Sequence, residues 1–110
     1  MLARKVSIHL RPDTIAEFTK ILEQEILPLL HKQPGFKDEI AFAVPGASEV
    51  LAISLWDGKP NAEAYNSGAY KDILKIFEPV VEGVPKIETT EVLHSTFHEI
   101  HEIAAGVPVA

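Results

Sequence analysis

The order of hydrophobic periodicities along the chain is the feature that most constrains its fold. Strand-like patterns occur at residues 4–11, 36–44, 50–56 and 86–99. Two segments with apolar residues three and four apart, typical of helices, follow the first and the third of these patterns. The order strand, helix, strand, strand, helix, strand is that of the split βαβ motif. We therefore predict an α+β, ferredoxin-like βαββαβ domain with a four-stranded antiparallel sheet.

Local signals indicate where the two helical segments begin and end. Thr14 and Glu17 have the spacing of a capping box, so the first helix is predicted to begin there and to run to about residue 31. Pro28 lacks an amide hydrogen and predicts a bend near the end of this helix. The second helical segment is predicted to break near Ser67, which would cap its second part, and to stop at Gly83.

Two proline–glycine pairs flank the second strand segment. Pro34–Gly35 precede it and Pro45–Gly46 follow it. In a type II turn proline suits the first central position and glycine supplies the positive φ of the second. Both pairs therefore predict tight turns.

The third strand segment is apolar on both sides. Leu51, Ile53 and Leu55 alternate with Val50, Ala52 and Trp56. Two crossover helices cover only one face of a four-stranded sheet, and a soluble monomer rarely leaves a large apolar face in water. We expect a homodimer in which two sheets pack face to face as a dimeric α/β barrel. The segment 86–99 is longer than an ordinary strand and is expected to extend beyond its own sheet.

Length and composition restrict the class of protein. A chain of 110 residues suits one domain (1–110), with a core at about 4–99 and a tail at 100–110. The absence of cysteine excludes disulfides and thiolate metal sites and fits a cytoplasmic protein. The net charge of -6 and the lack of a basic cluster disfavour nucleic acid as a partner. No apolar run is long enough to cross a membrane.

Three stretches resemble a known family. These are QPGF (Gln33–Phe36), ISLWDGKPNAEAY (Ile53–Tyr65) and the closing IETTEVLHSTF. Over residues 4–99 they are similar to the antibiotic biosynthesis monooxygenase-like family of dimeric α/β-barrel proteins. The resemblance implies a homodimeric barrel with a pocket between each helical layer and its sheet. Members of that family include cofactor-independent oxygenases of polycyclic phenols, quinol oxidases and haem-degrading enzymes.

One aromatic residue of the family's sites is matched in this chain, and the polar residues that accompany it in the family are not. Haem-degrading relatives pair a strand-three tryptophan, matched by Trp56, with a histidine on the second helix, where this chain has Leu74. They also carry an asparagine near the first strand, which is missing here. Phenol-oxidising relatives carry an asparagine four residues before that tryptophan, where this chain has Ala52. Haem cleavage is therefore disfavoured, and Trp56 alone is carried over.

Three aromatic residues are candidates for substrate binding. Trp56 ends a central strand, where its ring would form the wall of an aromatic pocket or pack in the core. Tyr65 and Tyr70 straddle the break in the second helical segment, and each offers a hydroxyl to a ligand. Tyr70 also falls on the apolar stripe of its helix, so core packing is the alternative.

Histidines are the candidates for a catalytic base. His9 lies on the side of the first strand opposite to Val6 and Ile8, and the segment around His94 approaches it if the two end strands meet at one site. A neutral imidazole would remove a phenolic proton; the alternative is a hydrogen-bonded structural histidine. His94 and His98 would be about 13 Å apart on a strand, too far for one ion, so no metal and no cofactor are expected.

Two functions remain open on this basis. The first is a cofactor-independent monooxygenase that acts on a small aromatic phenol or quinol near Trp56. The second is a non-catalytic homodimer that binds a small hydrophobic ligand or regulates a partner. The sequence leaves open whether the chain is an enzyme.

Overall fold

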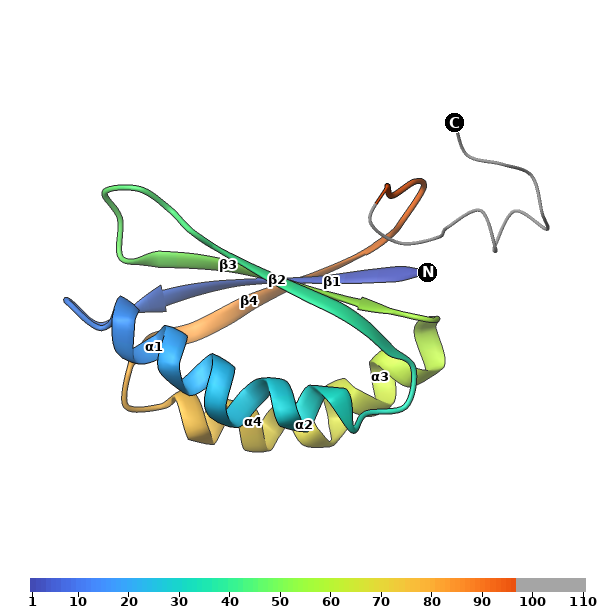
Figure 1. Cartoon of the computed structure of the whole chain (residues 1–110), viewed down its shortest axis with the longest axis horizontal. Helices are drawn as coiled ribbons and strands as arrows, with labels where there is room; N and C mark the ends of the chain where they lie inside the picture. Colours follow the sequence, from blue (N-terminus) through green and yellow to red (C-terminus); the bar gives the residue numbers. More distant parts are fainter. Residues whose placement is uncertain (97–110) are drawn as a thin grey trace.

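The computed structural model describes residues 1–96 and contains one four-stranded antiparallel sheet (Figure 1). Its strands are β1 (Leu2–Leu10), β2 (Phe36–Ala43), β3 (Glu49–Trp56) and β4 (Val81–Glu91). Their order across the sheet is β2-β3-β1-β4, so β3 and β1 are central. The predicted ferredoxin-like α+β fold is confirmed.

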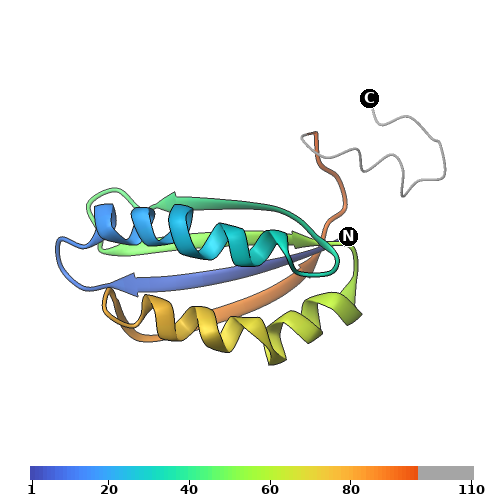
Figure 2. The same ribbon diagram turned by 60° about the horizontal axis from the view of Figure 1, so that its bottom comes forward.

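Two helical runs cover the same face of the sheet. The first comprises α1 (Ile15–Ile21), the π-helical turn η1 (Leu22–Ile26) and α2 (Leu27–His31), and the second comprises α3 (Lys59–Ser67) and α4 (Ala69–Phe77). Figures 1 and 2 show both runs on one side of the sheet, and residues 1–96 place no helix on the other side. Among residues 1–96, no helix has the length and apolar character that crossing a membrane requires.

The first helical run is continuous but irregular. The amide of Leu27 donates to the carbonyl of Leu22, the wider pattern of a π-helix, directly before Pro28. Because Pro28 has no amide hydrogen to continue the α-helical pattern, this turn is where the ladder is disturbed, as the proline predicted. The predicted capping box at Thr14 and Glu17 is wrong. The Thr14 hydroxyl donates backward to the carbonyl of Arg11 at 2.7 Å and does not cap the helix.

The second helical segment breaks as predicted but is capped by the backbone. Gly68 separates α3 from α4, and its amide donates to the carbonyl of Ala64 at 3.0 Å. The Ser67 side chain makes no cap hydrogen bond, because Ser67 is still the last residue of α3. The expected cap at Ser67 is therefore wrong.

The fourth strand begins and ends earlier than predicted. Helix α4 stops at Phe77 and β4 runs from Val81 to Glu91 rather than over 86–99. The pairing with β1 shifts register between Ser7 and His9, and Gly83 has a φ of 76° there. A β-bulge tolerates a positive φ and an unpaired residue, so a glycine that looked like a helix stop lies within a strand. Positions 97–99 and the tail 100–110 lie outside the described residues.

The core lies between the helix-covered face and the helices. Phe18 of α1 and Phe77 of α4 stack at a centroid distance of 4.6 Å and join the two helical runs. The buried apolar residues of the strands include Leu2, Val6, Ile8, Leu10, Val50 and Trp56. On β1 these are the even-numbered positions, so the odd-numbered ones lie on the face without helices.

The two turn glycines differ in their surroundings and give a matched test. Gly35 and Gly46 have φ values of 80° and 75°. An added Cβ at Gly35 would contact the Asp57 carboxylate and lie 2.7 Å from the Asn61 Cβ, whereas one at Gly46 would meet nothing within 4 Å.

Alanine substitution should therefore be far more harmful at Gly35. We expect Gly46→Ala to lower the free energy of unfolding by about 1–2 kcal/mol, from the left-handed backbone alone. Gly35→Ala adds steric overlap and should cost about 2–4 kcal/mol. Urea denaturation measures both, and equal losses would contradict the predicted crowding at Gly35.

Candidate functional site

A row of polar side chains crosses the otherwise apolar helix-covered face of the sheet. Arg4 of β1 lies opposite Ser54 of β3, and Ser54 lies opposite Glu39 of β2. Neighbouring strands are about 4.8 Å apart, so the backbones at Arg4 and Glu39 are about 10 Å apart. The next row toward the C-terminal end of β1 holds Val6 and Ala52. Two ionisable groups therefore lie in one row on the face of the sheet that the helices cover.

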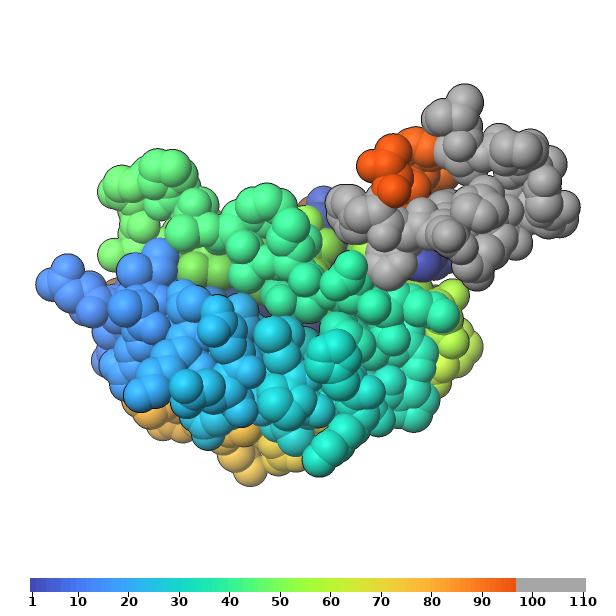
Figure 3. Space-filling view, viewed as in Figure 1, coloured from blue at the N-terminus to red at the C-terminus, as the bar shows by residue number. Residues whose placement is uncertain are grey.

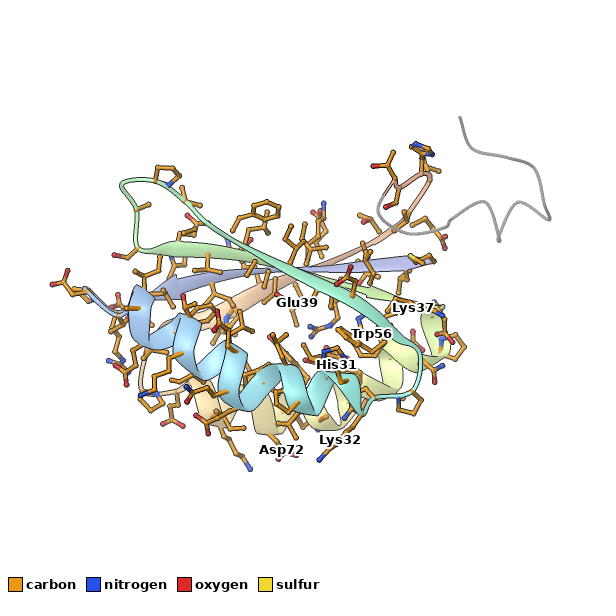
Figure 4. All side chains as sticks on the ribbon, in the orientation of Figure 1. His31, Lys32, Lys37, Glu39, Trp56 and Asp72 are labelled. Carbon is orange, nitrogen blue, oxygen red and sulfur yellow. The ribbon has the colours of Figure 1, made fainter. Side chains whose placement is uncertain are left out.

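A partly open cavity of about 60 Å³ lies over this polar row. Glu39 and Trp56 lie on the helix side of the sheet, whereas Lys32 and Asp72 point away from it (Figure 4). Besides Arg4, Ser54 and Glu39, the lining includes Tyr65, Tyr70, Leu22, Leu74 and Ala52. Ligand pockets usually measure about 300–1,000 Å³, so this cavity accepts water-sized guests without side-chain movement.

Arg4 is a buried cation held by aromatic rings. The residue is only 3 % exposed, and its guanidinium carbon lies 3.9 Å from the ring centre of Tyr70 and 5.2 Å from that of Tyr65. Nη2 donates to the Asn66 Oδ1 at 2.7 Å. Cation–π contacts of this kind partly replace the lost hydration of the charge. The result is a fixed positive charge at the edge of the cavity.

Glu39 is a carboxyl group with an unusually high proton affinity. Its Oε1 is buried and accepts no hydrogen bond from any residue in the described part of the chain. Burial, with a smaller contribution from the neighbouring Asp38 carboxylate, raises the pKa of Glu39 to about 7. A group with such a pKa gives up and takes up a proton near neutral pH. Glu39 therefore has the property required of a general base.

Trp56 is part of the packed core. It has no exposed surface, its ring stacks on Tyr65 at 4.7 Å, and it meets Phe36 edge-on at 5.6 Å. The indole Nε1 donates to the Ser54 Oγ at 2.9 Å. Trp56 does not line the cavity, whereas Tyr65 and Tyr70 do. Its ring instead orients Tyr65 and Ser54, which face the cavity.

The two tyrosines line the cavity and hold their rings over Arg4. Tyr65 is a buried residue near the end of α3, and Tyr70 lies in the first turn of α4. The break at Gly68 between the two helices places both rings over Arg4. Burial raises the pKa of the Tyr65 hydroxyl far above its usual range, and the positive charge of Arg4 opposes this effect. Tyr65 therefore stays protonated and is a hydrogen-bond donor at neutral pH.

The two candidate histidines lie away from the cavity. His9 is exposed on the face without helices, between Glu49 of β3 and Glu82 of β4. His94 is exposed and follows the end of β4, beside the opposite end of β1. Seven residues of strand, about 23 Å, separate the two ends. The structure does not bring His9 and His94 together within one chain.

No metal site is visible in the described part of the chain. Residues 1–96 contain no group of three histidine, aspartate or glutamate side chains that would hold an ion. His98 and His101 lie outside the described residues.

Sequence reasoning missed Arg4 and Glu39. The sequence signal for Arg4 was its place in the alternating pattern of the strand. Arg4 is two residues before Val6 and four before Ile8, so it lies on the same face as these apolar residues. A charged residue on the buried face of a strand is rare and is a candidate for a functional role. Glu39 gave a weaker signal, because β2 shifts register at its start, between Phe36 and Asp38.

Solved structures share this fold. A candidate antibiotic biosynthesis monooxygenase from Bordetella bronchiseptica superimposes with a TM-score of 0.71 at 15% identity over 84% of this chain and 98% of its own. The monooxygenase of the ActVA-Orf6 gene of Streptomyces coelicolor, solved with nanaomycin D, gives 0.71 at 14% identity over 86% and 88%. SnoaB, a cofactor-independent oxygenase from Streptomyces nogalater, gives 0.70 at 10% identity over 86% and 95%.

These likenesses confirm the fold that the sequence resemblance implied. The chain has the fold of antibiotic biosynthesis monooxygenase-like proteins. No family model and no curated protein matches the sequence. At identities of 10–15% the likeness describes architecture. Activity therefore has to be argued from the site.

Proposed function

We propose that the protein is a cofactor-independent oxygenase that oxidises a small aromatic phenol or quinol in the cavity over Arg4, Ser54 and Glu39. The observation that carries the proposal is the Glu39 carboxyl, with one buried oxygen and a pKa of about 7, in the same cavity as a buried guanidinium. The fold shared with a cofactor-independent oxygenase agrees with it.

The chemistry follows from the positions of these groups. The Glu39 carboxylate takes a proton from the activated O–H or C–H group of the substrate, and the Tyr65 hydroxyl, which lines the same cavity, stabilises the resulting anion. The electron-rich anion then reduces O₂ directly. For an anthrone, the ring CH₂ becomes a carbonyl group that keeps one oxygen atom, and the other oxygen leaves as water. No metal or organic cofactor takes part in this balance.

An aromatic substrate requires the cavity to widen. Phe18, Leu22 and Glu39 line both the cavity and a groove of about 370 Å³ between the first helical run and β2. Figure 3 views the molecule from the side on which this helical run and β2 lie. Rotation of the Leu22 side chain, which is only partly buried, would join the groove to the cavity. We propose that substrate reaches Glu39 by this route.

Oxygen uptake tests the proposed reaction. The protein is incubated in air with a panel of anthrones, naphthols and hydroquinones, and an oxygen electrode records the rate against a protein-free control. We expect uptake with at least one member, at a rate that rises with pH as Glu39 ionises near pH 7. Rates equal to the control across the whole panel would refute the proposal.

We also propose that two chains pair through the sheet face that carries no helix. This apolar face is formed by Ile40, Phe42, Leu51, Ile53 and Leu55. Phe42 is 47 % exposed and Ile40 is 42 % exposed in the single chain. Burial of such a face is favourable by about 25 cal/mol per Å² of apolar surface, and pairing with a second copy would achieve it.

Light scattering measures the predicted pairing. We expect a mass near twice the 12.1 kDa of the chain for the wild type. Phe42→Lys should shift the mass toward that of one chain, because a charge would be buried in the interface. Ala16→Lys, at an exposed residue of α1 on the other side of the sheet, is the matched control and should leave the dimer intact. A wild-type monomer would contradict this prediction.

A second candidate function is binding without turnover. Ala52 and Leu74, where oxygenase or haem-degrading relatives would carry polar groups, line the cavity with apolar surface. A ligand that binds only the folded state raises its melting temperature by mass action. Thermal stabilisation by a phenol without oxygen uptake would favour this function over oxidation.

A further inference from the structure

Arg4 faces two spaces at once. It lines the cavity over the polar row, and it also lines a groove of about 310 Å³ between α3 and β4. Ala62 and Asn66 of α3 and Ile87 and Thr89 of β4 form much of this α3–β4 groove. The guanidinium is therefore the boundary between the outer groove and the cavity in which Glu39 lies.

The charge of Arg4 has no counter-ion among residues 1–96. No carboxylate of the described chain lies within 4 Å of its guanidinium, and the bond to Asn66 Oδ1 is its only hydrogen bond there. Glu63 also lines the α3–β4 groove but pairs with Lys59 at 3.7 Å, with both side chains mostly exposed. Glu39 lies two strands away and is about half protonated at neutral pH.

A buried and uncompensated guanidinium is a strong site for an anion. A guanidinium has five N–H donors, of which one is used here, and its planar fork matches the two oxygens of a carboxylate. Removal of the charge from water is unfavourable, and the two tyrosine rings offset only part of this cost. A carboxylate would restore the balance and would use the free donors.

The groove also specifies the rest of the ligand. Leu2, Ala62 and Ile87 give it an apolar wall, and Ile87 is 43 % exposed in the single chain. The carboxylate end of an aromatic acid would lie between this wall and Arg4, with its ring extending toward Glu39. Glu39 and Arg4 are separated by two strand spacings, about 10 Å, which is the length of a two-ring to three-ring skeleton.

We propose that Arg4 binds the carboxylate of the ligand, so that the protein takes aromatic acids that carry a phenolic group at the opposite end. This inference names the substrate class of the site under "Proposed function" and rests on that function for the role of the phenol. The carboxylate binds at the α3–β4 groove, and the phenol lies toward Glu39.

A ligand pair and two variants test the role of Arg4. Calorimetry measures the dissociation constants of a hydroxynaphthoate and of its methyl ester, which share the ring system and differ in charge. For the wild type we expect the acid to bind at least about tenfold more tightly than the ester. Asn66→Asp places a carboxylate beside Arg4 and should remove this preference, because an internal ion pair then replaces the ligand. Lys59→Gln removes an exposed cation of the same groove and should keep the preference within about twofold.

The outcomes separate this inference from the oxidation chemistry. Equal affinities of the wild type for acid and ester would overturn the inference, and so would a preference that survives Asn66→Asp or disappears in Lys59→Gln. If a variant does not fold, the comparison of the acid and the ester in the wild type is sufficient to test the inference. A clear preference for the acid without oxygen uptake would support the inference and refute the oxygenase. Oxidation of neutral phenols with no preference for acids would do the reverse.

Discussion

Replacement of Trp56 by alanine is expected to lower the free energy of unfolding by about 3–5 kcal/mol. The indole has no exposed surface and packs between Phe36 and Tyr65, at centroid distances of 5.6 and 4.7 Å. Its removal leaves a cavity at the end of β3 where β1, β2 and α3 meet. It also removes the donor that holds the Ser54 hydroxyl at 2.9 Å.

Trp56→Phe is the matched control for this experiment. Phenylalanine keeps an aromatic ring against Tyr65 but loses the indole Nε1 donor, so we expect a smaller loss of about 1–2 kcal/mol. Chemical denaturation followed by circular dichroism measures both variants. A small stability loss in Trp56→Ala, together with a large change in ligand affinity, would mean that Trp56 is a wall of the binding site rather than a core residue.

The sequence predicted the architecture well because each element has a distinct period. Alternation in residues 4–11 and helical spacing from Tyr70 to Phe77 correspond to β1 and α4. The end of the second helical segment was harder to predict, because glycine and proline at Gly83 and Pro85 mark helix ends and β-bulges equally. The bulge is specified by pairing with β1, which is a long-range property that a local pattern does not contain.

The candidate site was harder to predict than the fold. Aromatic residues and histidines attract attention in a sequence, yet His9 lies on the face without helices and Trp56 is in the core. The groups that meet at the cavity come from β1 and β2, which are not neighbours in the sheet, and β3 places them in one row. Only strand register shows that Arg4 and Glu39 share a row.

Replacement of Glu39 by glutamine is expected to abolish most of the proposed oxygenase activity and, at alkaline pH, to stabilise the fold. Glutamine cannot take up the substrate proton, so kcat for oxygen uptake should fall about 10²–10³-fold. The stability effect has the opposite sign. The folded-state pKa is about 7 against an ordinary value of 4.5, so the folded state holds the proton more tightly than the unfolded chain does.

This difference determines how stability depends on pH. The contribution of Glu39 is fully present below about pH 4.5 and is lost as the pH rises through about 7, where folding forces a buried carboxylate to remain ionised. Glu39→Gln removes that loss. The two proteins should be equally stable near pH 4, and the variant should be about 1–3 kcal/mol more stable near pH 8.

Asp38→Asn separates the local charge effect from the role of the base. The Asp38 carboxylate contributes to the raised pKa of Glu39, so its neutralisation should move the midpoint of the pH–rate profile to lower pH and leave kcat within about tenfold.

Loss of activity without a gain in stability in Glu39→Gln would mean that Glu39 supports the fold instead of acting as a base. Activity lost together with stability gained is the pattern of a functional residue, because evolution keeps a costly buried carboxyl only where its chemistry is used.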